Sequence, residues 1–498
     1  MSGNNSEYKY LAGNLALFTI SNFVSKILVF LLVPFYTNVL TTSDYGIADV
    51  MQTTLLLLVP ALTINMGEAA LRYGIDRSDK RGEIFGTGLK FVAMASAIVA
   101  AVSLAACVFV KGSVKWYLFL FIFLFLTNCT YEFLILFFQG CEQVKIVVCG
   151  SVFSTVVLIG CNIFFLLIVK AGLNGYLLSQ MLAFTCASIL MLALGHRLMP
   201  GIVRAGMCKN DDPDKEFRKE LVSYGVPMIA YSTGSWINNA ADRYLVSLIK
   251  GVAVNGVYGV AYKIPAILTV FQRIFAQSWQ MSATKSYGDE NSKEFFSAMY
   301  RGYNTFMVAG CSFLILVVKP VALFMFRKDF YSAWLYVPPL LISVVFGALT
   351  GFLGSICLAY KDSKAMGWAT GTGAVLNIVL NLILIPGYGA MGAAVATGIS
   401  YFTMYFMAYR KVAGYVKLDV NLRRDYASYI LLIIEAVIMI CGDRPGLAGN
   451  TEYIVSAVIF IVISAMYLKE MIRIVTKLIE LLFKQLSGRR LNGDKGEE

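Results

Sequence analysis

Long apolar segments recur along the whole chain, each about as long as a helix that crosses a bilayer. Such a helix needs about 20 consecutive, mostly apolar residues. Of the 498 residues, 58% are hydrophobic and 14% are charged, whereas about a quarter of the residues in a soluble domain are charged. We therefore expect an all-α polytopic membrane protein with about 14 transmembrane helices. The predicted helices lie near residues 10–40, 44–71, 84–110, 115–139, 145–169, 175–196, 220–248, 256–281, 295–318, 331–359, 365–385, 389–410, 426–441 and 452–474.

Lysine and arginine concentrate in alternate loops between these segments. Cytoplasmic loops of membrane proteins carry the excess of basic residues, so the pattern predicts that both termini are cytoplasmic. The longest internal hydrophilic stretch, 197–219, reads as a cytoplasmic linker between two halves. The predicted domains are an N-terminal lobe with this linker (1–216), a C-terminal lobe (217–411), and two further helices with a cytoplasmic tail (412–498).

An internal repeat supports this division. Residues 30–51 align without gaps on residues 243–264, with Tyr-Gly-Ile-Ala at 45–48 matching Tyr-Gly-Val-Ala at 258–261. Six predicted helices separate the two copies, so both halves enter the membrane in the same direction. That arrangement is a parallel repeat with its axis along the membrane normal. Chance similarity between two apolar segments is the alternative explanation.

Five basic residues lie inside the apolar segments, several residues from either end. A charge near the bilayer centre costs about 2.5–3.5 kcal/mol even on lenient insertion scales, so such residues usually face a water-filled cavity. All five carry the same sign, which favours an anionic cargo. The predicted cationic cleft consists of Lys26, Arg243, Lys263, Arg273 and Arg301.

Polar residues form faces on the first and seventh predicted helices. Their helical spacing puts most of them on one side of each helix, and the repeat places several at equivalent positions. The predicted polar lining of the cleft is Asn22, Ser25, Ser235, Asn239 and Asp242. Two alternatives remain open: polar residues can join helices to one another, and Asp242 can form an ion pair with Arg243 or Lys263.

Three further charged residues are candidates for a functional role or lack an explanation. Glu68 and Arg72 stand at the inner end of the second predicted helix, where they are candidates for an inner gate, although charged side chains at a membrane interface also simply reach toward water. Glu435, inside the thirteenth predicted helix, has no obvious partner in the sequence.

Several function classes are disfavoured. The net charge of +12 comes from scattered basic residues rather than a dense arm, so we expect no nucleic-acid partner. The chain has a single histidine, and its ten cysteines form no C-x-x-C pair, so we expect neither a metal site nor a cofactor. A phosphate-binding loop is absent from the sequence, and no predicted outer loop is large enough for a catalytic domain. We therefore do not expect an enzyme.

Two segments carry a resemblance to a known family. The segment 25–51 (SKILVFLLVPFYTNVLTTSDYGIADVM) resembles the opening of bacterial polysaccharide repeat-unit flippases of the Wzx type, and 377–398 (NIVLNLILIPGYGAMGAAVATG) resembles their hairpin between helices eleven and twelve. These flippases are members of the multidrug/oligosaccharidyl-lipid/polysaccharide (MOP) exporter superfamily. The helix count and the 6+6+2 organisation extend the resemblance over essentially the whole chain.

The resemblance implies a fold and an activity. It implies two six-helix lobes in a V, as in MATE-type transporters, with a cationic lumen and alternating access. The implied substrate is an undecaprenyl-pyrophosphate-linked oligosaccharide, flipped from the inner to the outer leaflet of the bacterial cytoplasmic membrane for capsule, O-antigen or exopolysaccharide. The lumen cations would hold the pyrophosphate, and Lys26, Arg243, Lys263 and Arg273 are candidates by helix position. A proton or sodium gradient is a candidate driving force, and the polysaccharide polymerase and assembly machinery are candidate partners, besides membrane lipids.

Alternative functions remain open at this stage. A lipid II flippase of the same superfamily would carry more arginines in helices one and two than the single Lys26 of helix one. A multidrug or cation antiporter would need carboxylates deep in its helices, and by sequence only Asp242 and Glu435 qualify. A membrane glycan polymerase or a non-transporting scaffold belongs to another class, and neither explains the buried cations.

Overall fold

The computed structural model describes residues 32–201, 215–286, 292–442, 451–473 and 476, and in these residues the regular structure is helical. Seven helices are long and apolar enough to cross a membrane, or up to nine if each of two bent helix pairs counts as one span, among the residues described. The prediction of an all-helical, multi-pass membrane protein is confirmed. The first predicted helix, 10–40, lies mostly outside the described residues, which begin at residue 32 and include α2 (Val33–Val39) in its last part.

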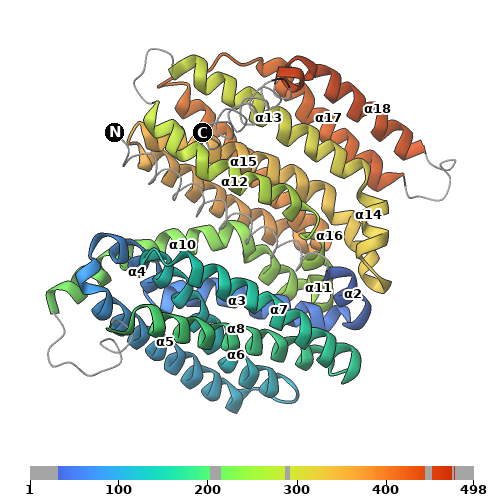
Figure 1. Ribbon diagram of the computed structural model, residues 1–498. Coiled ribbons are helices and arrows are strands. Elements are labelled where there is room, and N and C mark those ends of the chain that lie inside the picture. Colours follow the sequence, from blue (N-terminus) through green and yellow to red (C-terminus); the bar gives the residue numbers. More distant parts are fainter. Residues whose placement is uncertain (1–31, 202–214, 287–291, 443–450, 474–475, 477–498) are drawn as a thin grey trace, which may run out of the picture. The chain divides into compact units, whose positions relative to one another are not determined.

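The chain divides into two compact units (Figure 1). Unit 1 runs to Val260 and includes Met325–Phe330, and unit 2 comprises Ala261–Phe324 and the chain from Tyr331 onward. This division assigns the helix at 215–250 to unit 1, whereas the sequence places it at the start of the second lobe. The predicted lobe boundaries at 216 and 411 therefore stay a prediction.

Unit 1 contains the helices of the N-terminal half. They are α2 (Val33–Val39), α3 (Thr42–Leu62), α4 (Met66–Asp76), the 3-10 turn η1 (Ser78–Lys80), α5 (Arg81–Phe109), α6 (Val114–Gly140), α7 (Val144–Asn162), the π-helical η2 (Ile163–Ile168), α8 (Gly172–Leu198), α10 (Lys215–Lys250) and α11 (Val252–Ala261). Helix α6 packs against α4, α5 and α8, and α10 packs against α3 and α4. The core around α6 is aromatic, with the Phe85 and Phe137 rings 5.0 Å apart.

The second predicted helix, expected to be continuous over 44–71, is broken. Helix α3 ends at Leu62 and α4 begins at Met66. Between them Ile64 and Asn65 have positive φ angles of 54° and 47°, a left-handed conformation that the short polar side chain of asparagine tolerates better than most. The hydropathy pattern continues through the break, so apolar periodicity alone does not reveal it. The break turns polar backbone and side-chain groups toward the pocket described below.

The two copies of the repeat contact each other where α3 and α11 cross. A Cβ atom on Gly46 would lie 1.8 Å from the Val252 carbonyl oxygen, and one on Gly256 would lie 1.9 Å from the Thr42 carbonyl oxygen. Only glycine permits this approach of two backbones. Tyr45 and Tyr258, the matching tyrosines of the repeat, are both buried.

Unit 2 is built around α15. Its elements are α12 (Pro265–Lys285), α13 (Ser292–Leu316), α14 (Val318–Met325), the 3-10 segment η3 (Lys328–Tyr336), α15 (Val337–Ala359), α16 (Ser363–Val412), α17 (Leu422–Cys441) and α18 (Thr451–Met466). The stacked rings of Trp279 and Phe352, 4.2 Å apart, join α12 to α15. Helix α16 is interrupted at Gly389, where φ is 60° and ψ is −140°. This break separates the eleventh and twelfth predicted helices where the sequence expected it.

Helices α17 and α18 lie side by side and pack on α13 (Figure 1). Glu435 of α17 is fully buried and accepts hydrogen bonds from the hydroxyls of Ser312 and Ser456, each at 2.6 Å. The carboxyl group thus links three helices. No partner of Glu435 could be predicted from the sequence, because Ser312 and Ser456 are 123 and 21 residues away.

The turn between α15 and α16 carries a second polar link, outside the apolar spans. Asp362 accepts hydrogen bonds from the Tyr415 hydroxyl and from the backbone N–H of Ala365, and pairs with the Lys411 ammonium at 3.1 Å. These donors lower the pKa of Asp362 to about 2. The carboxylate therefore stays ionised at neutral pH and ties the turn to the end of α16.

Candidate functional site

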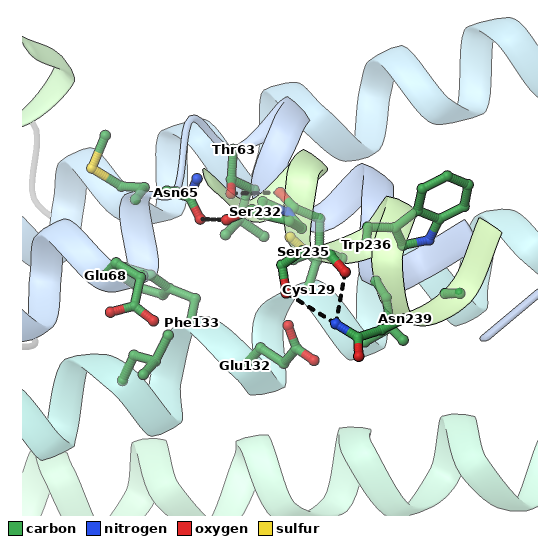
Figure 2. Close-up of a pocket in the computed structure, with 18 of the residues that line it drawn as sticks. Thr63, Asn65, Glu68, Cys129, Glu132, Phe133, Ser232, Ser235, Trp236 and Asn239 are labelled. Atoms are coloured by element: carbon green, nitrogen blue, oxygen red, sulfur yellow. Dashed lines mark hydrogen bonds between the residues drawn. The ribbon is translucent and has the colours of Figure 1, made fainter. Parts of the chain in front are cut away.

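A pocket of about 360 Å³ lies inside unit 1, between α3, α4, α6 and α10 (Figure 2). Its volume is at the lower end of the range of small-molecule sites, about 300–1,000 Å³. The lining is mixed, because aliphatic and aromatic groups alternate with hydroxyls, amides and charged groups. The polar and charged lining residues are Thr63, Asn65, Glu68, Glu132, Ser232, Ser235, Asn239 and Arg243.

The break between α3 and α4 supplies one side of this pocket. Thr63 and Asn65 come from the break itself, and Glu68 comes from the first turn of α4. The Asn65 side-chain oxygen accepts a hydrogen bond from Ser232 of α10 at 3.3 Å. Asn65 is 6% exposed, and its side-chain nitrogen Nδ2 is buried without a hydrogen-bond partner in the described part of the chain. A donor of this kind can bind an acceptor on a ligand.

One face of α10 lines the side of the pocket opposite the break between α3 and α4. Ser232, Ser235, Asn239 and Arg243 are spaced by three or four residues, so they project from one helical face. The Asn239 amide donates to the Ser235 carbonyl at 2.7 Å and to its hydroxyl at 3.3 Å (Figure 2). The Trp236 indole N–H donates to the Thr53 carbonyl at 2.8 Å, which fixes α10 against α3.

Arg243 at one end of the pocket is already paired. Its guanidinium lies 2.9 Å from the Asp49 carboxylate of α3, and the Asn255 amide of α11 donates to the other oxygen of Asp49 at 3.2 Å. Asp242, which the sequence offered as an ion-pair partner, accepts hydrogen bonds from the Tyr258 hydroxyl at 2.7 Å and from the Arg243 backbone N–H at 2.9 Å. The partner of Arg243 is thus a residue 194 positions away that the sequence did not single out.

Glu132 is a second residue that the sequence reasoning missed. It belongs to the long apolar helix α6 and lines the pocket beside Cys129 and Phe133. In Figure 2 its carboxylate points toward the side of the pocket formed by Ser235 and Asn239. Asp49 and Glu132 therefore join Asp242 and Glu435 as carboxylates within the spans. The sequence does carry a signal for this residue, since Glu132 is an isolated acid in an apolar run.

The structure brings together only part of the predicted site. Ser235, Asn239, Arg243 and Glu68 line this pocket, whereas Arg72 pairs with Asp76 at 3.1 Å on an exposed stretch of α4. The remaining predicted residues lie elsewhere. Lys26, Asn22 and Ser25 are outside the described residues. Lys263, Arg273 and Arg301 belong to unit 2, where Arg273 is exposed and Arg301 pairs with Asp419 at 3.5 Å. The cationic cleft and the inner gate stay predictions.

Comparisons with solved structures identify the fold class. The structure of the lipid II flippase MurJ in an inward-closed conformation matches with a TM-score of 0.66 and 14% identity, over 93% of this chain and all of that chain. An inward-facing MATE-family multidrug resistance transporter of the MOP superfamily matches with a TM-score of 0.61 and 12% identity, over 78% of this chain and 95% of that one. The chain therefore shares its fold with these two solved transporter structures.

The sequence comparisons identify the family to which the chain belongs. The family of polysaccharide biosynthesis proteins matches residues 11–280, more than half of the chain, and the chain belongs to this family. A relative in Haloferax volcanii, a probable low-salt glycan biosynthesis flippase called Agl15, is 23% identical over 230 residues. That match covers 46% of this chain and spans about half of the relative, 48%. The resemblance to MOP-type polysaccharide flippases drawn from the sequence is confirmed.

Proposed function

We propose that the protein flips undecaprenyl-pyrophosphate-linked oligosaccharide repeat units from the inner to the outer leaflet of the bacterial cytoplasmic membrane, with both termini in the cytoplasm. The flipped units would serve the synthesis of a cell-surface polysaccharide, and a polymerase would consume them. One observation carries the proposal: every residue that lines the unit 1 pocket lies within the segment 11–280 matched by the polysaccharide biosynthesis family. The family match and the internal polar pocket therefore coincide.

The pocket offers the chemistry that a sugar head group needs. Hydroxyl and amide groups such as those of Ser235 and Asn239 can exchange hydrogen bonds with sugar hydroxyls, and the apolar lining covers the ring faces. The prenyl tail has no need of a protein cavity, since it can stay in the lipid. The pyrophosphate would be held by basic residues of the predicted cationic cleft, Lys26, Arg243, Lys263 and Arg273, and a proton or sodium gradient would drive the return step.

A flipping assay in vesicles tests this proposal. The purified full chain is reconstituted into liposomes that contain a fluorescent, short-chain prenyl-pyrophosphate oligosaccharide, and a membrane-impermeant quencher is added outside. We expect the protein to make inner-leaflet probe accessible to the quencher, because flipping exchanges the two leaflets, whereas protein-free liposomes keep that pool protected.

The same vesicles distinguish lipid-linked glycan flipping from the rival function, multidrug transport. A multidrug antiporter on this fold would move an organic cation such as ethidium and leave the lipid-linked probe protected. That pair of results would contradict the proposal. Transport of the lipid-linked probe without ethidium movement is the result that the proposal requires.

A further inference from the structure

The charge balance of the unit 1 pocket differs from that expected for a site that only holds anions. Two carboxylates, Glu68 and Glu132, line the pocket together with one basic side chain, Arg243. The charge of Arg243 is already countered by Asp49 at 2.9 Å. Among the lining residues that the structure describes, two acidic side chains therefore stand beside one basic side chain that is already paired.

Of the two acidic side chains that line the pocket, Glu132 is the better placed to bind a ligand. It comes from the middle of α6, a 27-residue apolar helix, and Figure 2 shows its carboxylate turned into the pocket. No basic side chain in the described ranges of the chain forms an ion pair with it. A carboxylate within a membrane span is costly unless a positive group compensates it.

A second polar group in the pocket, the Asn65 side-chain amide, needs a hydrogen-bond acceptor as its partner. The Asn65 Nδ2 donor is buried and has no acceptor in the described part of the chain, and Asn65 lines the same pocket as Glu132. A matching ligand therefore carries a positively charged donor for the carboxylate and, on the same small skeleton, an oxygen acceptor for the amide. A sugar with a free amine has both. The volume of about 360 Å³ suits one or two sugar rings rather than a long glycan.

We infer that this pocket selects a lipid-linked glycan by a sugar that carries a protonated amine, with Glu132 as the residue that binds the ammonium group and Asn65 as the donor to a sugar oxygen. The inference rests on the proposed function and deepens it by naming the chemical class of the head group. The same charge balance disfavours acidic sugars, because a uronic acid would place a second carboxylate beside Glu132.

Binding measurements on the detergent-solubilised full chain test this inference. Isothermal titration at pH 7 uses three short-chain prenyl-pyrophosphate disaccharides that end in glucosamine, N-acetylglucosamine or glucuronic acid. We expect the wild type to bind the glucosamine probe at least roughly tenfold more tightly than the N-acetyl probe, since a hydrogen bond between charged groups contributes about 1.5–3 kcal/mol and about 1.4 kcal/mol is tenfold in affinity. The glucuronic acid probe should bind most weakly.

Two pocket variants and one control variant test which residues produce the preference for the amine probe. Glu132→Gln keeps the size of the side chain and should abolish the preference for the amine while binding of the N-acetyl probe persists. Asn65→Leu should weaken the glucosamine and N-acetyl probes alike. Glu83→Gln removes the same charge from an exposed position on α5, outside the pocket, and should leave the preference intact.

Three results of these binding measurements would contradict the inference. Equal affinity of the wild type for the amine and N-acetyl probes, a preference that survives Glu132→Gln, or no binding of any probe would each overturn the inference. The flipping assay with an N-acetylated cargo decides the proposed function separately, so a flippase that does not prefer amines refutes only the inference.

Discussion

Replacing Gly46 by alanine is expected to lower the thermal stability of the protein sharply. The added Cβ would lie 1.8 Å from the Val252 carbonyl oxygen, and a backbone atom cannot turn aside as the end of a flexible side chain can. Helices α3 and α11 must therefore separate. Overpacking a core costs about 1–3 kcal/mol and occasionally more, and we expect the upper end here. The unfolding temperature in detergent, followed by intrinsic fluorescence, measures the effect.

Gly160 provides the matched control. It also lies within a helix, α7, but a Cβ there would meet nothing within 4 Å. Gly160→Ala should leave the unfolding temperature unchanged or raise it slightly, because alanine favours the helix by about 1 kcal/mol over glycine. Equal unfolding temperatures for Gly46→Ala and Gly160→Ala would show that α3 and α11 do not touch as described.

The second large effect is expected from the Asp49–Arg243 pair. Their side chains are only 9% and 19% exposed, and removing one partner of a buried pair leaves an uncompensated charge at a cost of about 3–5 kcal/mol. Asp49→Leu and Arg243→Met should each destabilise the protein strongly. The double variant should recover much of the loss, because neither charge then remains. A double-mutant cycle on unfolding temperatures gives the coupling between the two residues.

An exposed ion pair on helix α4 gives a reference value for the coupling energy measured in that cycle. Arg72 and Asp76 of α4 are 58% and 42% exposed and one helical turn apart, and such pairs contribute about 0.3–0.5 kcal/mol. The coupling between Asp49 and Arg243 should exceed it several-fold. Additive single effects at Asp49 and Arg243 would argue that the buried pair does not form in solution.

The sequence predicted the helices far better than it predicted the contacts between them. Apolar runs of bilayer length depend on local composition, so most predicted spans correspond to observed helices in the described residues, including the separation at Gly389. The predicted spans 44–71 and 256–281 are exceptions, because each is divided between two helices. The break at Ile64 and Asn65 was not predicted, since it is a change of two backbone angles within a run whose hydropathy does not change.

The candidate site was predicted only in part for a related reason. Ser235, Asn239 and Arg243 were found because helical spacing places them on one face of α10. Asp49 was not, because its pairing with Arg243 spans 194 residues and no pattern in a single sequence encodes that distance. Glu132 was missed for a different reason: the expectation of an anionic cargo directed attention to basic residues. The structure shows acids on the pocket wall as well.

The central claim is that the unit 1 pocket holds the head group while it is flipped, and filling the pocket tests it most directly. The measurement compares flipping rates of Ser235→Trp, which places an indole in the pocket, with those of Val156→Trp on α7, where the native side chain is 58% exposed. At matched unfolding temperatures the account predicts that Ser235→Trp loses most of the flipping activity and that Val156→Trp keeps it. Full flipping by Ser235→Trp would contradict the account.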